Sequence, residues 1–346
     1  MTLFSHRTTT SITSIAAVFA LLLPISAHAD QSFSDVPESH YAHKAIEFLK
    51  KNGVINGYED GTFQPNKAVN RAEAIKMITG PLIDQDQLAL VTGTPFDDVP
   101  DGAWYLPYVE AARQNNIIDG PPKKTSFLGS NQVLKAEYIK MLIRAYQEDE
   151  NSYSEIRLPF STDVSNADDW FYPYMRFALS SSMTTINTSG VLQPGKKLTR
   201  AETAEMLYRL IQYKQGNRTQ DLLTNAENEI IVTLGMLDQN NLTAAQHASA
   251  RALIAARGAL TSKPDSNLVK GALKITEAFR SVVRAYQEGA SGNFAEVVRL
   301  SGESWNLGAK AQEFDPSMAK LAEQVQSISK QMADGARNQL EGGSES

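Results

Sequence analysis

The chain has 346 residues, no cysteine, and 33 lysine and arginine residues against 39 aspartate and glutamate residues, a net charge of −6 at pH 7. A chain of this length usually forms two or three domains and easily supports a buried core. The acidic balance argues against a nucleic-acid binder, which would carry a basic surface. The absence of cysteine excludes a disulfide scaffold, thiolate zinc sites and cysteine nucleophiles.

Residues 1–29 have the pattern of a secretory signal peptide. His6-Arg7 precede an apolar run from Ile12 to Ile25, and Ser26-Ala27-His28-Ala29 supplies the small residues of a cleavage site. The run is about 14 residues long, whereas a membrane-spanning helix needs roughly 20. We expect cleavage near Ala29-Asp30 and a secreted protein of the cell surface or envelope, without a membrane span after cleavage. A retained anchor is the alternative.

Three later segments share two landmarks. Each segment starts with a Phe-x-Asp-Val pattern or a close variant, whose aspartates are Asp35, Asp98 and Asp163. Each ends in a basic-Ala-Glu triplet, and the triplets start at Arg71, Lys135 and Arg200. The aspartates are 63 and 65 residues apart, and the distance from aspartate to basic residue is 36, 37 and 37. Two landmarks with one period indicate an internal repeat.

Each repeat is predicted to form a helix, a loop and a second helix. Gly57 and Gly61 supply turn chemistry in the first loop. Capping boxes are predicted at the start of two second helices, from Asn70 with Glu73 and from Thr199 with Glu202. Leu134 takes the capping position in the second repeat, so that box is lost. Apolar stripes on the second helices predict a core that the three repeats share.

The order of these motifs resembles the S-layer homology family. The first repeat has the start Phe33-Ser34-Asp35-Val36, an aromatic residue at Tyr41 and the loop Gly57-Tyr58-Glu59-Asp60-Gly61-Thr62-Phe63-Gln64-Pro65. The third repeat has the ending Leu198-Thr199-Arg200-Ala201-Glu202. The second repeat is degenerate, because Pro121-Pro122-Lys123-Lys124 replaces the middle of its loop. The resemblance covers roughly residues 31–214.

The predicted organisation follows from these motifs. The repeats are expected at residues 30–79, 95–144 and 159–214, with linkers at 80–94 and 145–158. The resemblance implies that the three repeats fold around a central helical bundle, with grooves between them. It also implies a non-catalytic anchor whose grooves bind secondary cell-wall polymers or peptidoglycan-linked glycans.

The resemblance assigns candidate glycan-binding residues. The arginine of the family's Thr-Arg-Ala-Glu motif corresponds to Arg71 and Arg200. Lys135 keeps the charge in the second repeat but lacks the planar fork that grips a carboxylate. One aromatic residue per repeat could stack on a sugar face or pack in the core: Tyr41, Trp104 and Trp170.

The residue chemistry leads to an independent expectation. Arginine in the first turn of a helix is unfavourable, because the helix start already carries partial positive charge. We therefore expect a bound anion, held by this arginine and by free N–H groups. The alternative is ion pairing with the repeat aspartates or with a glutamate of an adjacent repeat. Asp35, Asp98 and Asp163 are expected to cap or brace the first helix of each repeat.

Residues 219–340 are predicted to form an antiparallel helical bundle. Helices are expected near 220–239, 242–261, 265–289, 294–313 and 316–340, with capped starts at Ser262, Asn293 and Asp315. Residues 341–346 are expected to be a disordered tail. The bundle is interpreted as a spacer, with an interaction module as the alternative.

The fold class predicted is therefore mainly α, with three repeats on a shared helical core followed by a bundle. The predicted partner is a cell-wall polysaccharide or peptidoglycan-linked polymer, with other envelope proteins as further candidates and no nucleic acid. No cofactor or catalytic residue is predicted. No metal site is predicted either, since His40 and His43 lack a third ligand. Two alternatives remain: a secreted enzyme with an all-helical catalytic domain, and a structural protein whose repeats bind no glycan.

Overall fold

The structure is a computed structural model that describes residues 32–342. The predicted signal peptide and the last four residues lie outside this range. Within it the chain is helical, with single backbone bridges and no extended strand. No helix among these residues has the length and apolar character needed to span a bilayer.

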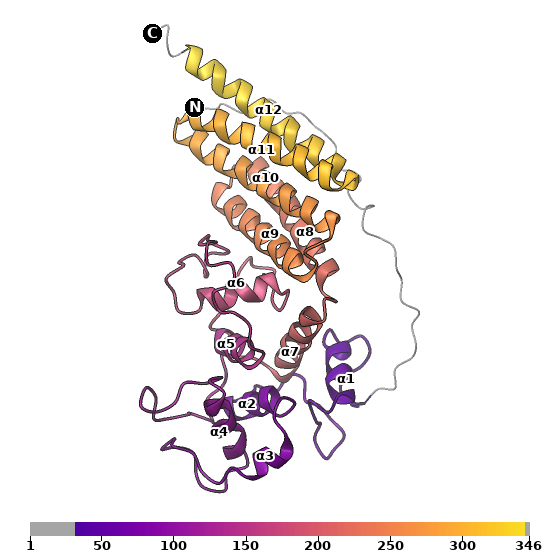
Figure 1. The fold of residues 1–346 in the computed structure, drawn as a ribbon, viewed down its shortest axis with the longest axis vertical. Helices are drawn as coiled ribbons and strands as arrows, with labels where there is room; N and C mark the ends of the chain where they lie inside the picture. Colours follow the sequence, from indigo (N-terminus) through magenta and orange to yellow (C-terminus); the bar gives the residue numbers. More distant parts are fainter. Residues whose placement is uncertain (1–31, 343–346) are drawn as a thin grey trace. The chain divides into compact units, whose positions relative to one another are not determined.

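Each predicted repeat contains the expected pair of helices (Figure 1). The pairs are α1 (His43–Lys51) with α2 (Arg71–Thr79), α4 (Leu106–Gln114) with α5 (Lys135–Ala145), and α6 (Tyr172–Ser180) with α7 (Arg200–Lys214). The predicted linker at 80–94 is not unstructured throughout, because it holds the short helix α3 (Gln85–Ala89).

The three repeats are joined by a closed ring of backbone hydrogen bonds. The Val69 N–H donates to the Leu198 carbonyl at 3.0 Å, the Leu198 N–H to the Val133 carbonyl at 3.1 Å, and the Val133 N–H to the Val69 carbonyl at 3.0 Å. These residues occupy equivalent positions, 64 and 65 apart, and all three side chains are fully buried. Each repeat therefore satisfies the backbone of the next, and the third returns to the first.

The second helices pack around this ring and form the expected shared core. Each also packs on the first helix of the following repeat: α2 on α4, α5 on α6 and α7 on α1. Polar contacts cross the core as well. The Tyr138 hydroxyl donates to the Thr203 carbonyl at 3.1 Å, and the Thr203 hydroxyl contacts the Met77 sulfur at 3.7 Å. Tyr138 is fully buried, so this hydrogen bond satisfies a hydroxyl that has no access to water.

The C-terminal region contains the five expected long helices. They are α8 (Thr219–Asp238), α9 (Leu242–Ser262), α10 (Asn267–Ala290), α11 (Phe294–Phe314) and α12 (Ala319–Gly342), with the 3-10 turn η1 (Pro316–Met318) before the last. One predicted start was wrong, and another is confirmed in position but lacks a side-chain capping bond. Ser262 ends α9, and Ser266 caps α10 instead; Asn293 precedes α11 but makes no capping hydrogen bond. Helix α12 also extends two residues into the predicted tail, to Gly342.

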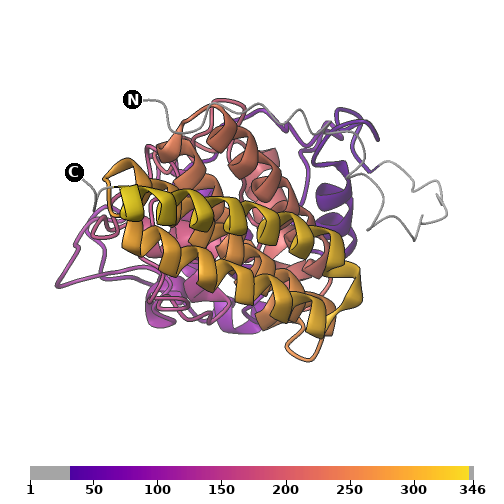
Figure 2. The same cartoon turned by 90° about the horizontal axis from the view of Figure 1, so that it is seen from above.

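These helices form a repeated stack. Helices α9 and α11 both have 21 residues and start 52 positions apart, and α10 and α12 both have 24 residues and start 52 positions apart. Each helix packs mainly on its neighbours in sequence, and Figure 2 shows α12 lying along α11. This pattern is typical of a helical-hairpin solenoid, and the exposed side of α12 is mainly polar.

The third repeat packs directly on this stack through α6 and α9. Arg251 on α9 is buried, pairs with Glu229 of α8 through two contacts of 2.7 Å, and donates to the Phe160 carbonyl of the third repeat at 2.5 Å. Burial of a charge is tolerated here because both an acid and a carbonyl compensate it.

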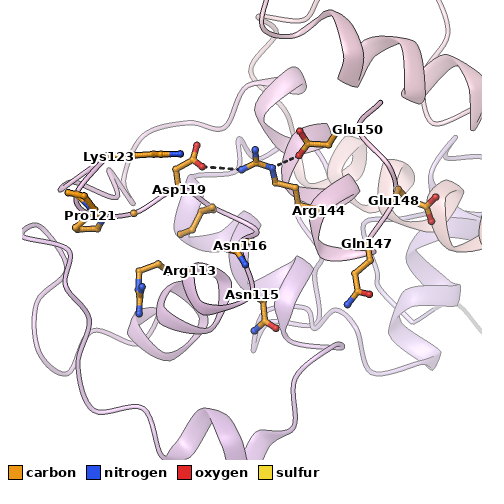
Figure 3. A pocket seen from close by; sticks show the side chains of 13 residues that line it. Arg113, Asn115, Asn116, Asp119, Pro121, Lys123, Arg144, Gln147, Glu148 and Glu150 are labelled. Carbon is orange, nitrogen blue, oxygen red and sulfur yellow. Dashed lines mark hydrogen bonds and ion pairs between the residues drawn. The ribbon is translucent and has the colours of Figure 1, made fainter. Parts of the chain in front are cut away.

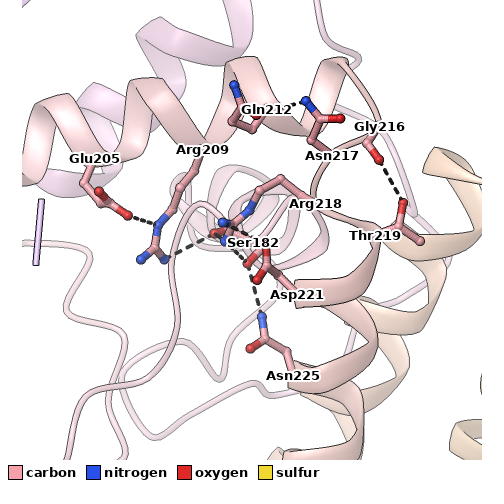
Figure 4. Close-up of polar contacts among 10 residues, drawn as sticks. All are labelled: Ser182, Glu205, Arg209, Gln212, Gly216, Asn217, Arg218, Thr219, Asp221 and Asn225. Atoms are coloured by element: carbon pink, nitrogen blue, oxygen red, sulfur yellow. Dashed lines mark hydrogen bonds and ion pairs between the residues drawn. The ribbon is translucent and has the colours of Figure 1, made fainter. Parts of the chain in front are cut away.

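A second contact between the third repeat and the stack centres on Ser182 (Figure 4). Its buried hydroxyl accepts hydrogen bonds from Arg218 at 2.9 Å and from Asn225 on α8 at 3.2 Å. Only four residues separate α7 from α8. The stack is therefore a continuation of the third repeat with no extended linker between them.

Gly258 allows the close approach of α9 to α6. A Cβ atom at this position would lie 1.7 Å from the Ser180 carbonyl oxygen. We predict that Gly258→Ala lowers the free energy of unfolding by about 2–3 kcal/mol, because the two helices must separate. Gly235→Ala on α8 is the matched control, since its Cβ would meet no atom within 4 Å. It should stabilise the protein by up to about 1 kcal/mol through higher helix propensity. Urea denaturation followed by circular dichroism measures both, and similar effects of the two variants would contradict the assigned contact.

Candidate functional site

The basic residue of each triplet reaches a carbonyl of the neighbouring repeat. The Arg200 Nε donates to the Phe63 carbonyl at 2.8 Å, and its Nη2 donates to the Asn56 carbonyl at 3.1 Å. The other two repeats follow the same rule: Arg71 Nε donates to the Phe127 carbonyl at 3.0 Å, and Lys135 Nζ donates to the Leu192 carbonyl at 2.7 Å. The three basic residues therefore join the repeats in a cycle.

The helix starts offer fewer free N–H groups than the sequence suggested. The N–H groups of the first two residues of α2, Arg71 and Ala72, donate to the carbonyls of Asn131 and Gly129 in the second repeat. Helices α5 and α7 use their first two N–H groups in the same way, on carbonyls of the third and first repeats. The expectation of an anion held by free helix N–H groups was therefore wrong, because neighbouring carbonyls already compensate the positive helix ends.

The alternative of ion pairing is confirmed for Arg71 with a glutamate of the adjacent repeat, but not for the repeat aspartates. Arg71 lies 3.9 Å from Glu137 of the adjacent repeat, but its closer partner is the Phe127 carbonyl. Burial lowers the pKa of Arg71, and the nearby Glu137 partly offsets this. Within residues 32–342 no ion pair joins Arg71, Lys135 or Arg200 to a repeat aspartate.

The repeat aspartates hold the loop and not the first helix. Asp35 accepts from the N–H groups of Phe63 and Gln64 at 2.7 and 2.8 Å. Asp98 accepts in the same way from residues 127 and 128, and Asp163 from residues 192 and 193. The carbonyl that receives the neighbouring arginine or lysine belongs to the first residue of each pair. One carboxylate thus positions the acceptor on which the contact between repeats depends.

The capping residues lie at the helix starts. Asn70 accepts from the Glu73 N–H at 2.8 Å and Glu73 accepts from the Asn70 N–H at 3.0 Å; Thr199 and Glu202 form the same pair at 3.3 and 3.0 Å. In the second repeat half of this box persists, because Glu137 accepts from the Leu134 N–H at 3.2 Å.

The two loop glycines are needed for different reasons. Gly61 has φ 77°, in the left-handed region that glycine adopts without strain. At Gly57 a Cβ would lie 2.3 Å from the Phe33 ring.

The three repeat aromatics are surface residues. Tyr41 is 62% exposed, and Trp104 and Trp170 are each 54% exposed, so none is a core residue. Trp104 lies beside Lys76 of α2, whose Nζ is 5.5 Å from the ring centroid. Trp170 packs against Tyr174, at 6.2 Å between ring centroids.

A cavity of about 290 Å³ lies where all three repeats meet, and we call it the first groove. The first repeat supplies the loop Val54–Tyr58 with Glu73, Lys76 and Met77, the second supplies Trp104, and the third supplies Arg200. Arg200 also lies 4.9 Å from the Tyr58 ring centroid. Cations, a carboxylate and two aromatic rings thus converge on one cavity.

Lys76 distinguishes this groove from its counterparts. No carboxylate within the described part of the chain forms an ion pair with it, and its contacts are the rings of Trp104 and Tyr108. The equivalent residue of the second repeat, Lys140, pairs with Asp119 at 3.5 Å. The third repeat has Glu205 there, paired with Arg209 at 2.6 Å. Only the first of these equivalent positions presents a cation without an acidic partner.

The sequence reasoning did not find Lys76. A lysine on an exposed helical face carries no motif, and its importance depends on its unpaired state. Aligned repeats do contain one signal, since Asn56 precedes Gly57 where Asp119 precedes Gly120. The neutral residue leaves the lysine of the first repeat without a partner.

The S-layer homology domain model matches residues 32–75, 95–139 and 162–204. The chain therefore carries three tandem S-layer homology domains, and the predicted family and number of repeats are confirmed. The matched segments end before α8.

The chain is similar to parts of much longer proteins. It is 29% identical to the Surface-layer 125 kDa protein of Lysinibacillus sphaericus over 202 residues, which cover 57% of this chain and 16% of that protein. It is 27% identical to S-layer protein EA1 of Bacillus anthracis over 59% of this chain and 23% of that protein. It is 30% identical to an amylopullulanase of Thermoanaerobacterium thermosulfurigenes over 54% of this chain and 10% of that enzyme. The chain thus matches less than a quarter of each of these relatives.

The buried Lys135 leads to a pH-dependent prediction. Burial, and then the nearby Lys196, lower the pKa of Lys135 to about 8. An unfolded lysine has a pKa of about 10.4, so between these values the unfolded chain binds more protons than the folded chain. The free energy of unfolding should therefore rise from about pH 8 to about pH 10.4, by up to about 3 kcal/mol, relative to Lys135→Met. Paired urea titrations across this range measure the difference, and parallel pH profiles of the two proteins would contradict the prediction.

Proposed function

We propose that this protein is held non-covalently at the cell envelope by a cell-wall glycan that binds in the first groove. The observation that carries this proposal is the unpaired Lys76 beside Trp104 and Arg200 in one cavity. An anionic substituent of the glycan would pair with Lys76, and a sugar face would stack on the exposed Trp104.

Arg200 has a double role in this proposal. Its Nε and Nη2 hold the loop of the first repeat, while its Nη1 has no hydrogen-bond partner among the described residues. It can therefore donate one hydrogen bond to a ligand without releasing the loop. A pyruvate ketal or a uronic acid fits this pair of cations, because each combines a carboxylate with a sugar ring.

The helical stack is proposed as a spacer or interaction module, and the protein as non-catalytic. The similarity to an amylopullulanase concerns 10% of that enzyme. It supports S-layer homology domains as modules that are joined to varied partners, and it assigns no reaction to residues 219–342.

Sedimentation of the mature chain with purified wall sacculi tests the groove. We predict that Lys76→Ala and Trp104→Ala each weaken binding about 5- to 30-fold, corresponding to a loss of about 1–2 kcal/mol each. Lys140→Ala is the matched control, because it removes the equivalent lysine, which Asp119 already neutralises. It should bind like the wild type.

The double variant Lys76→Ala with Trp104→Ala decides the proposal. If it sediments as well as the wild type, the first groove is not the binding site. Arg71 and Arg200 are less suitable for this test, since both hold a neighbouring loop. Chemical removal of secondary polymer from the sacculi separates the two glycan sources: binding is lost if the polymer is the ligand and kept if peptidoglycan is.

A further inference from the structure

A second and larger cavity lies between the second repeat and the segment that follows it (Figure 3). Its volume is about 550 Å³, which is within the range of pockets that hold small ligands, about 300–1,000 Å³. It is bounded by the ends of α4 and α5, by the loop Ile118–Lys123 and by the segment that follows α5. We call it the second-repeat cavity. It shares no lining residue with the first groove.

Ion pairs fix the side chains along one wall of this cavity. Arg144 donates to Glu150 at 2.5 Å and to Asp119 at 3.2 Å, and Figure 3 shows these three side chains in a row. Arg113, at another edge, is paired with Glu110 at 2.6 Å. The pairs fix the orientation of these groups before a ligand arrives, which lowers the cost of ordering them on binding.

Two further lining side chains carry amide groups with no partner in the described chain. Asn116 and Gln147 follow the ends of α4 and α5, and both have left-handed backbone conformations, with φ 58° and 55°. Glycine adopts this conformation at lower energetic cost than asparagine or glutamine. The backbone conformation therefore does not explain why these two positions carry amide side chains.

The repeat equivalents of Asn116 show what is specific to this cavity. Gly53 in the first repeat and Ser182 in the third also have positive φ, at 69° and 57°. Gly53 has no side chain, and the Ser182 hydroxyl is buried against α8. The same backbone turn thus carries a free amide only in the second repeat of the three.

The lining indicates an uncharged ligand with many hydroxyl groups. It contains three cationic and three acidic side chains, and apart from Lys123 each already has an ion partner. Except at the solvent-exposed Lys123, a charged ligand would therefore compete with existing pairs. Planar amide, carboxylate and guanidinium groups present two hydrogen-bonding atoms side by side, which match adjacent hydroxyls on a pyranose ring. Only Ile118, Pro121 and Pro122 offer apolar side chains, so an apolar ligand would gain little.

We propose that the second-repeat cavity binds a short, uncharged saccharide through Asn116, Gln147 and the Arg144 network. This proposal rests on the proposed glycan-binding function for its ligand class, and it adds a site that recognises neutral sugar units apart from the anionic group at the first groove. A polymer with both kinds of unit could then contact the protein at two places.

Nuclear magnetic resonance of the full mature chain tests the site, with chitotriose, mannotriose and laminaritriose as probes. We expect at least one of these sugars, at up to about 10 mM, to shift the side-chain amide signals of Asn116 and Gln147, which detects a Kd near 1 mM. Glucuronic acid, the charged control, should leave these signals unchanged. No shift with any trisaccharide, or an equal shift with glucuronic acid, overturns the proposal.

Glycine variants provide the matched controls. Asn116→Gly and Gln147→Gly remove the amides while favouring the observed backbone, so both should fold, and together they should reduce binding at least tenfold. Gln193→Gly makes the same change at φ 56° outside the cavity and should bind like the wild type. Equal binding by the double variant overturns the proposal. Lys76→Ala should also leave sugar binding here unchanged, so failure at one site is distinguishable from failure at the other.

Discussion

The ring of backbone hydrogen bonds among Val69, Val133 and Leu198 is the constraint on which the three repeats depend. Each bond pairs a buried donor of one repeat with a buried acceptor of another, so omission of one repeat would leave two buried groups unsatisfied. The same closure fixes the start of each second helix against the next loop. It thereby sets where Arg200 and its equivalents lie, and where the grooves between repeats open.

This closure gives the basic-Ala-Glu triplet a structural meaning. The basic side chain donates a hydrogen bond to a carbonyl of the neighbouring repeat, and the buried alanine permits close approach of that repeat. The glutamate accepts a hydrogen bond from the N–H of the residue that precedes the triplet. The triplet persists in the second repeat, where Lys135 replaces arginine and the family's loop motif is lost. Conserving the contact between repeats and conserving a ligand site are therefore separate demands, and Lys76 and Lys140 show how the grooves can diverge while the ring stays intact.

Much of the fold could be predicted from the sequence, because it follows from local patterns. Periodic landmarks located the repeats, and apolar stripes located the helices to within a few residues. The prediction of an anion held by free N–H groups at the helix starts was wrong. The carbonyls that accept hydrogen bonds from the Arg71 side chain and from the N–H groups at the start of α2 lie about 57 residues further along the chain, so no local pattern indicates them. The 52-residue period of the stack was also missed, although Pro264 and Pro316 repeat at that spacing. Those prolines stand among dissimilar residues, and only helix lengths make the period plain.

The direct packing of α9 on α6 has a mechanical consequence. A protein fixed at its repeats and pulled at its far end transmits force through whatever joins the two parts. Here the load would pass through the Gly258 contact, the hydrogen bond from Arg251 to the Phe160 carbonyl and the Ser182 hydrogen bonds, all in the third repeat or beside it. These contacts would share the load in parallel. The third repeat would thus bear tension first, and the ring would distribute it to the other two.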